Sequence, residues 1–347
     1  MRAKENIACE SKEYITDKGA KLSKIVKEGT LLASFKLTLG RIAFASKDLY
    51  TNGAIAAITI KSEKELDKYF LFHFLTFFDW NAATEGDIKV KGRTLNKAKL
   101  KEIEVHFPRT LSEQQRLVAI LDEAFAAITQ AKAKAEQNRK NSKELFESYL
   151  QSVYENKDES WEEKSLNQIS ENLDSKRIPI TKSQRSSGSI PYYGASGIVD
   201  YVEDYIFDED LLCISEDGAN LLARTYPIAF SIRGKTWVNN HAHVLRFRNV
   251  ISQKFVELYL NSIQLNDFVS GMAQPKLNQA MLNKIPIPFP PLPKQATIIQ
   301  KLDAFSVETK KLEAIYQKKI EDLEELKKSI LQKAFNGELK TTKAVAV

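Results

Sequence analysis

The chain has 347 residues, more than one ordinary domain holds, and its 51 basic and 45 acidic side chains give a formal net charge of +6. It carries no apolar run of about 18 residues and no apolar stretch near its start, which argues against a membrane or secreted protein and favours the cytoplasm. Cys9 and Cys213 are too few and too far apart for a disulfide framework or a structural zinc site.

The chain contains one unit twice. Residues 95–108 read LNKAKLKEIEVHFP, and residues 277–290 read LNQAMLNKIPIPFP. Each copy runs into a long helical pattern, and the two patterns end alike, in ELFESYLQSVYEN and ELKKSILQKAFNG. Such self-similarity marks a repeated structural unit. We expect a first domain at 1–106, a first spacer helix at 107–157, a second domain at 158–288, a second spacer helix at 289–337 and a flexible tail at 338–347.

The first domain is basic and is shortened at its start relative to the second. It carries 19 basic and 14 acidic side chains, and the segments GTLLASF, GRIAFAS and KYFLFHFLTFF predict strands and a helix. Aligning Leu31 with Leu211 places Met1 near Thr181, so residues 161–180 have no counterpart. Either this domain lacks an edge strand and a loop, or its start lies upstream of the sequence.

Both helical stretches carry apolar or small residues alternately three and four positions apart, which is the seam of a coiled coil. Small residues of the first helix, such as Ala124 and Ala131, can face large residues of the second, so we expect the two helices to pair. A pseudo-twofold axis favours an antiparallel pair, and the alternative is that each helix lines its own domain. The large residues predicted in the seam are Leu117, Leu121, Ile128, Leu145 and Tyr149 on the first helix and Ile298, Leu302, Leu312, Leu323, Leu326 and Ile330 on the second.

The second domain reads as short strands and loops punctuated by glycines, with a helical segment FVELYLNSI. Its 13 basic and 16 acidic side chains make it weakly acidic, so a polyanion would meet a few placed residues instead of the whole domain. The expected fold class is α+β: two mixed α/β domains, separated by two long antiparallel coiled-coil helices and related by a pseudo-twofold internal repeat.

A search for catalytic chemistry finds no complete site. Gly234, Lys235 and Thr236 imitate the end of a phosphate-binding loop, but an alanine stands where the first glycine is required. His241 and His243 alternate along a predicted strand without an evident third ligand, which favours a packed or hydrogen-bonded pair over a metal site. The triplet at 216–218, Glu-Asp-Gly, is typical of a turn. We therefore expect no catalytic residue, no metal and no cofactor in this chain.

The run from Gly271, GMAQPKLNQAMLNKIPIPFPPLPKQATIIQKLD, and the heptad helix that ends near Phe335 resemble the specificity subunit of type I restriction-modification enzymes. The segments IPYYGASG and FDEDLLCISEDGA are similar to the target-recognition domain of the same family. The resemblance covers nearly the whole chain and is weakest before Leu31.

This resemblance implies a non-catalytic adaptor that binds double-stranded DNA. Each recognition domain would read one half of a bipartite target, and the helices would act as a ruler between the halves. Two methyltransferase subunits would flank the chain, and restriction or motor subunits would complete the complex. S-adenosylmethionine, ATP and magnesium would belong to those partners.

Base edges are read by Arg, Lys, Asn or Gln, and phosphates are bound by Lys, Arg or backbone amides, so loops rich in these types are the candidate DNA contacts. Each residue alone is as readily an ordinary solvated charge, and the hypothesis rests on the cluster. The candidates are Lys176, Arg177, Lys182, Gln184, Arg185, Arg233, Lys235, Gln274 and Lys276 in the second domain, with Lys89, Lys91 and Arg93 in the first.

Two other functions fit the same features. A structural scaffold would use the paired helices to space two protein-binding domains, and it would show no sequence-selective DNA binding. A specificity module with one working recognition domain would read a short or palindromic target, with self-association restoring symmetry. The DNA target itself cannot be read from loop residues, because contacts depend on loop geometry.

Overall fold

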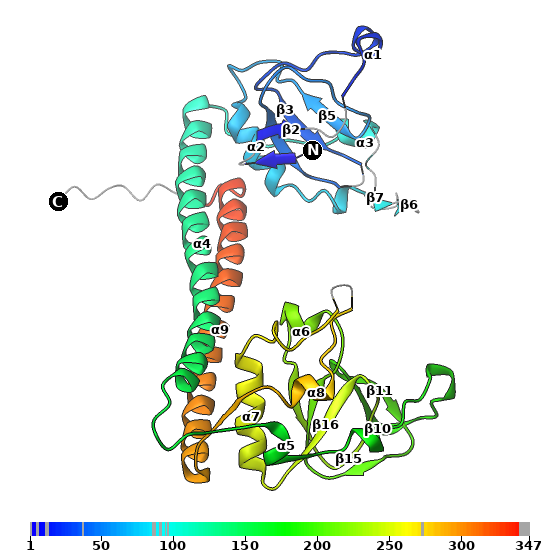
Figure 1. Cartoon of the computed structure of the whole chain (residues 1–347). Helices are drawn as coiled ribbons and strands as arrows, with labels where there is room; N and C mark the ends of the chain where they lie inside the picture. The colour runs from blue at the N-terminus through cyan, green and yellow to red at the C-terminus, as the bar shows by residue number, and fades with distance from the viewer. Residues whose placement is uncertain are drawn as a thin grey trace, which may run out of the picture. The chain divides into compact units, whose positions relative to one another are not determined.

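The computed structural model separates the chain into two compact units, each containing one globular part and portions of both long helices (Figure 1). Unit 1 comprises Met1–Glu136 with Gln317–Val347, and unit 2 comprises Gln137–Tyr316. The structure describes residues 2–4, 7–10, 14–36, 38–84, 88–89, 92–93, 95, 97–271 and 274–339. Most of the predicted tail, from 340 onward, lies outside the described residues.

Unit 1 is built on one five-stranded sheet with β3 near its centre. β3 pairs antiparallel with β4 on one side and with β5 on the other. The sheet runs in the order β1 (Arg2–Lys4), β2 (Ile7–Glu10), β4 (Ile42–Ala45), β3 (Leu31–Ser34) and β5 (Ile55–Ile58). Around it lie α1 (Asp17–Leu22), α2 (Lys68–Phe77), η1 (Ala82–Thr84), β6 (Ile88–Lys89), β7 (Gly92–Arg93) and α3 (Lys97–Lys101).

Helix α2 supplies much of the unit 1 core because it is rich in aromatic residues. It begins at Asp67, whose carboxylate accepts from two backbone N–H groups of the first turn. Phe72 stacks on Phe44 of the sheet with ring centroids 5.4 Å apart. Phe335, at the end of the second long helix, contacts Phe74 edge to face at 5.5 Å. Burying one such ring contributes about 1.5–3 kcal/mol.

The two long helices, α4 (Leu111–Glu155) and α9 (Leu292–Phe335), run antiparallel within each unit. In unit 1, Leu121 packs with Leu331, and farther along α4 Lys132 forms an ion pair with Glu324. In unit 2, Tyr149 packs on Phe305 with ring centroids 4.6 Å apart. Rising numbers on α4 thus meet falling numbers on α9. The predicted antiparallel pairing is confirmed.

The register of the seam differs from the strict heptad that we expected. Leu145, Leu312 and Leu326 are exposed, at 49%, 39% and 48% respectively. On α4 the half-buried Phe146 takes the inward place, and on α9 Glu313 does so. A straight helix has 3.6 residues per turn, so a seam that repeats every 3.5 residues gradually turns away from the partner helix. Two consecutive steps of four residues bring the seam back to face the partner. Of the other predicted seam residues, Leu117, Leu121, Ile128 and Leu302 are buried, and Tyr149, Ile298, Leu323 and Ile330 are half-buried.

Unit 2 contains two four-stranded sheets and one strand pair. One sheet runs β14 (Ala229–Ile232), β13 (Leu211–Ser215), β16 (Ala242–Phe247) and β9 (Ser170–Asn172). The other runs β11 (Gly197–Val202), β10 (Ser187–Gly194), β15 (Lys235–Val238) and β12 (Phe207–Asp208). β17 (Ile287–Phe289) pairs with β8 (Glu162–Lys164). The helices are α5 (Leu166–Ile169), η2 (Asp174–Lys176), η3 (Lys182–Gln184), α6 (Asn220–Ala223), α7 (Val250–Ser262) and α8 (Gln279–Leu282).

The core of unit 2 joins the first of these sheets to the long helices through α7 (Figure 1). Phe255 of α7 is fully buried and meets Tyr154 of α4, whose hydroxyl donates to the Phe255 carbonyl at 3.0 Å. Leu302 of α9 and Leu245 of β16 belong to the same cluster.

The repeat is visible in matching backbone hydrogen bonds. In unit 1, the N–H of Leu95 donates to the carbonyl of Phe35 at 2.9 Å. In unit 2, the N–H of Leu277 donates to the carbonyl of Glu216 at 2.8 Å. Leu95 and Leu277 open the two repeated segments, and each acceptor follows an inner strand of its sheet, β3 in unit 1 and β13 in unit 2. Phe35 and Glu216 therefore occupy equivalent positions.

Candidate nucleic-acid interface

A charged cluster lies in unit 2 where β13 ends and β16 begins. Arg177, just after η2, places Nη1 2.7 Å from Glu216 Oε2 and 2.7 Å from the carbonyl oxygen of Ala242. Its Nη2 lies 3.6 Å from Asp174, and the arginine side chain is only 13% exposed. This arginine was predicted as a DNA contact, but its guanidinium is held inside the domain.

His243 completes the cluster and is buried. Its Nδ1 lies 2.6 Å from Asp174 Oδ2, and its Nε2 lies 2.7 Å from the carbonyl oxygen of Leu277. Burial raises the pKa of Asp174, but the hydrogen bond and charge of His243 outweigh it, so this pKa lies below its ordinary value. Burial likewise raises the pKa of Glu216, and the hydrogen bond from Arg177 with the charge of His243 lowers it overall.

The same cluster has the residue types of a metal site. Among the described residues, Asp174, Glu216 and His243 offer ligand atoms that all lie within 4.8 Å of one another. The donors are already used: both ring nitrogens of the histidine face acceptors, and Lys276 adds a second cation 3.2 Å from Glu216 Oε1. A metal ion would have to displace Arg177 and Lys276, so we assign no metal to it.

The loop after this cluster exposes part of its predicted contact set. Lys176, Lys182 and Gln184 are exposed. Arg185 instead folds back: its Nη1 lies 2.9 Å from Asp200 Oδ2, its guanidinium lies 4.4 Å from the ring centre of a tyrosine, and its side chain is 19% exposed. The two lysines are exposed to a ligand, whereas the amide oxygen of Gln184 already accepts from the Thr181 hydroxyl at 2.7 Å. The arginine orders the loop.

Strand β15 brings a second group of candidates beside this loop. Lys235 and Trp237 share one face because side chains alternate along a strand. Trp237 Nε1 donates to the carbonyl of Ile178 at 2.6 Å, so this face adjoins the loop. Lys235 Nζ lies 4.5 Å from the ring centre of Tyr205. Arg233 donates from Nε to an aspartate at 2.8 Å, yet its side chain remains 80% exposed.

The other candidates fall in two places. Gln274 is exposed, and Lys276 is 52% exposed while paired with Glu216, so both lie at the rim of the charged cluster. In unit 1, Lys89 lies in β6 and Arg93 in β7, and their side chains are not described. Lys91 lies outside the described residues. The structure therefore brings the unit 2 candidates together in part and does not test those of unit 1.

Sequence reasoning missed the acidic partners that hold Arg177. The spacing of Asp174 and Arg177, three residues apart, was an available signal for a local pair. Glu216 was read only as part of a turn. The sequence favoured a packed or hydrogen-bonded pair for His241 and His243 but did not identify their partners. His241 hydrogen-bonds to Asp217 at 2.8 Å, whereas His243 belongs to the charged cluster.

The segment that imitates a phosphate-binding loop continues into a strand. Lys235 and Thr236 lie in strand β15, and Thr236 is buried, so this segment is not a phosphate-binding loop. Within the described part of the chain, no helix has the length and apolar character needed to span a membrane.

Comparisons with known proteins give a consistent result. The family model "Type I restriction modification DNA specificity domain" matches residues 5–137 and again 158–324. A type I restriction enzyme specificity subunit of Haemophilus influenzae is 37% identical over 161 residues, which is 46% of this chain and 41% of that protein. The Escherichia coli EcoprrI specificity subunit is 23% identical over 321 residues, covering 89% of this chain and 79% of that protein.

Solved structures agree in fold. A chain from a structure concerned with complex assembly and conformational transition of the type I R-M system has a TM-score of 0.76, covering 91% of this chain and 84% of that one. The HsdS subunit from Thermoanaerobacter tengcongensis has a TM-score of 0.57, covering 91% and 82%. Both are 17% identical to this chain, so the likeness concerns the fold alone.

Proposed function

Because this chain belongs to the family of type I restriction-modification DNA specificity domains, we propose that it is the DNA-recognition subunit of a type I restriction-modification system. The observation that carries the proposal is that the family model matches twice, once over each half of the repeat. Each half would read one part of a bipartite target, and the paired helices would set the spacing between the parts. In this account the chain itself catalyses nothing and needs no cofactor.

The proposed contact surface of unit 2 consists of the exposed residues of the loop and of strand β15. Lys182 and Lys235 supply positive charge for phosphates, and Gln184 offers an amide for base edges. Arg177 and Arg185 position this surface indirectly, because their ion pairs hold the loop to the domain. Lys176, Arg233, Gln274 and Lys276 extend the proposed surface in unit 2, and Lys89, Lys91 and Arg93 remain the proposal for unit 1.

The proposed protein partners are two methyltransferase subunits and restriction or motor subunits. Helix α9 leaves large apolar residues uncovered, with Leu312, Ile315 and Leu326 exposed at 39%, 59% and 48%. Exposed apolar residues on a helix surface suit a protein interface. This supports docking of methyltransferase subunits on the outer faces of the helices.

Selection of duplexes from a randomised pool tests the function. The chain would be purified with its methyltransferase subunit, and bound duplexes would be sequenced at several salt concentrations. We expect enrichment of a split motif with a fixed gap. Enrichment of no sequence would instead support a protein scaffold.

A single short motif would support the second candidate, a module with one working recognition domain. One observation favours that candidate: within the described residues, β5 of unit 1 pairs only with β3, whereas its counterpart β16 pairs with both β13 and β9.

A further inference from the structure

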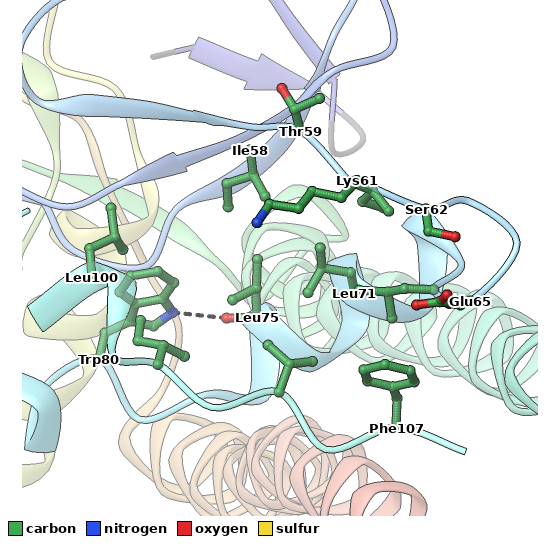
Figure 2. Close-up of a pocket in the computed structure, with 14 residues that line it drawn as sticks. Ile58, Thr59, Lys61, Ser62, Glu65, Leu71, Leu75, Trp80, Leu100 and Phe107 are labelled. Carbon is green, nitrogen blue, oxygen red and sulfur yellow. Dashed lines mark hydrogen bonds between the residues drawn. The ribbon is translucent and has the colours of Figure 1, made fainter. Parts of the chain in front are cut away.

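Unit 1 contains an apolar cavity of about 370 Å³ between its sheet edge and α2. Figure 2 shows Leu71 and Leu75 of α2 facing Ile58 of β5, with Phe107 at one end and Trp80 at the other. The indole Nε1 of Trp80 donates to the carbonyl of Leu75 at 2.8 Å, which fixes that end of the wall. Ile60, Ile103 and Val105 also line the cavity.

The strand pairing identifies the same place in unit 2. Ser34 lies opposite Ile55 in unit 1, and its equivalent Ser215 lies opposite Ala242 in unit 2. Counting along both strands makes residues 58–60 equivalent to 245–247. The sequence repeat makes residues 103–107 equivalent to 285–289.

In unit 2 this place is occupied by the chain itself. β9 pairs with Leu245, Arg246 and Phe247, and β8 pairs with β17. Between these two strands α5 buries Leu166 completely within the main core cluster. A strand, a short helix and a second strand, residues 162–172, thus cover the edge.

In unit 1 the described residues leave the equivalent surface uncovered. Leu245 is 1% exposed, and Ile285 and Ile287 are fully buried, whereas their counterparts Ile58, Ile103 and Val105 are only half-buried. Phe107 is 40% exposed. Among the described residues no strand pairs with the outer edge of β5, which leaves backbone donors and acceptors open to a further strand.

We propose that this groove of unit 1 binds a strand–helix–strand segment of polypeptide with the sequence pattern of Trp161 to Leu173, supplied by a segment that is not built into unit 2. One strand of the segment pairs with residues 105–107, a leucine equivalent to Leu166 enters the cavity, and the second strand pairs with residues 58–60. Main-chain pairing gives affinity, and the buried leucine gives specificity. The inference does not depend on DNA binding, so its failure leaves the proposed function untouched.

A second copy of this chain is not the occupant. Its own residues 162–172 are built into unit 2, where Leu166 is fully buried. If residues 162–172 of a second copy filled the groove of the first, they would leave an equivalent cavity in unit 2 of the second copy. The exchange would gain nothing, so the occupant must be a segment of this pattern that is not already built into a domain.

The test uses a fluorescent peptide of residues 160–174 of this chain, titrated against the full chain and followed by anisotropy. We expect saturable binding, and we expect the peptide with Leu166→Asp to bind at least about tenfold more weakly because the buried side chain is lost. Val105→Glu in the protein should abolish binding. Lys101→Gln, which changes the charge by the same amount at an exposed residue that does not line the cavity, should leave binding unchanged.

Hydrogen exchange provides a second measurement. Saturating peptide should slow exchange at the amides of residues 58–60 and 105–107, and thermal melting verifies that each variant is folded. If Val105→Glu does not fold, Phe107→Asp replaces it, because Phe107 is 40% exposed. The proposal is overturned if the wild-type chain binds no peptide, if the groove variant binds equally well, or if the chain self-associates through this groove.

Discussion

The two units share a backbone arrangement but place opposite kinds of side chain, apolar and charged, at one equivalent position. In unit 1 the residue after the inner strand β3 is Phe35, which is 2% exposed and packs in an apolar core. In unit 2 the equivalent Glu216 is paired with Arg177 beside His243. Both residues still accept the same backbone hydrogen bond, from the N–H of Leu95 in unit 1 and of Leu277 in unit 2. The repeat is therefore conserved in its backbone hydrogen bonds, whereas the side chains at equivalent positions differ between the units.

The difference also teaches what the charges do. A buried ion pair is often no more stabilising than a well-packed apolar group, so stability alone does not explain why unit 2 has an ion pair where unit 1 has Phe35. In unit 2 the cluster ties the loop after η2 to the ends of two central strands. That loop carries Lys182 and Gln184 of the proposed DNA surface. We interpret the cluster as the support that orders this loop.

The largest expected effect comes from removing the central cation of unit 2. Arg177→Met removes the cation that Glu216 and Asp174 share, which should lower the free energy of unfolding by about 3–5 kcal/mol. Only Lys276 and His243 would remain beside the two carboxylates. Urea denaturation of the full chain, followed by probes in unit 2, measures it. Arg185→Met is the matched control, because its partner Asp200 is 38% exposed and stays solvated. Equal losses from the two variants would contradict the role given to the cluster.

Acidification should lower the stability of unit 1 at a higher pH than that of unit 2. His73 of unit 1 has a pKa lowered by burial, although Asp122 at 2.9 Å raises it in part. Above its ordinary value of 6.5 the ring is neutral in both states; below 6.5 the unfolded state takes up the proton first, so unit 1 loses stability as pH falls. Denaturation between about pH 7.5 and 5.5 should show this slope, and His73→Gln should flatten it.

Unit 2 should respond to acid later. The pKa values of Asp174 and Glu216 lie below their ordinary values of 3.8 and 4.5, so their contribution is complete above those values. It is lost only as pH falls through the lower folded-state values. A unit 2 transition that weakens together with unit 1 near pH 6 would count against this assignment.

Salt dependence compares the proposed DNA surfaces of the two units. Replacing Lys182 and Lys235 by glutamine should reduce the slope of log affinity against log salt by about 0.9 for each phosphate that the protein no longer neutralises. Lys89→Gln with Arg93→Gln makes the matched change in unit 1. Slopes measured by DNA titration of the assembled complex show which unit contributes. Unchanged slopes in both variants would remove these residues from the interface.

The smallest stability effect is expected on the exposed face of α9. Leu312→Lys should change the free energy of unfolding by no more than about 0.5 kcal/mol, because this leucine is 39% exposed. The same variant should reduce co-purification of the methyltransferase subunit if this face is the docking surface. Glu308→Lys, one turn away and 65% exposed, is a control for added charge. Full co-purification of the leucine variant would exclude Leu312 from that surface.

Much of the fold was predictable because it depends on patterns within short stretches of chain. The repeat at 95–108 and 277–290 predicted two related domains, and the heptad seam predicted paired helices. The exact register was not predictable, because seams of 3.5 and 3.6 residues per turn diverge slowly along a helix. By Leu312 the two differ by one position, which exchanges this leucine for Glu313. The pairing direction needed the contact of Tyr149 with Phe305 to decide it.

The candidate site was predictable only as a class of residues. Charge and loop position selected Arg177 and Lys182 alike, but they did not reveal that Glu216, far along the chain, neutralises the first. Such partners depend on how strands meet, which a single sequence does not specify. The cavity beside Ile58 was foreshadowed by the missing counterpart of residues 161–180, yet its apolar lining required the structure.

The most direct test of the account is a map of adenine methylation across a test genome after co-expression of the chain with the methyltransferase subunit proposed as its partner. Two reading units predict a split motif whose halves are separated by a fixed gap. Arg177→Met, where it still folds, should degrade one half of that motif and leave the other intact. A single short motif, or no methylation from a stable complex, would contradict the claim that both units read DNA.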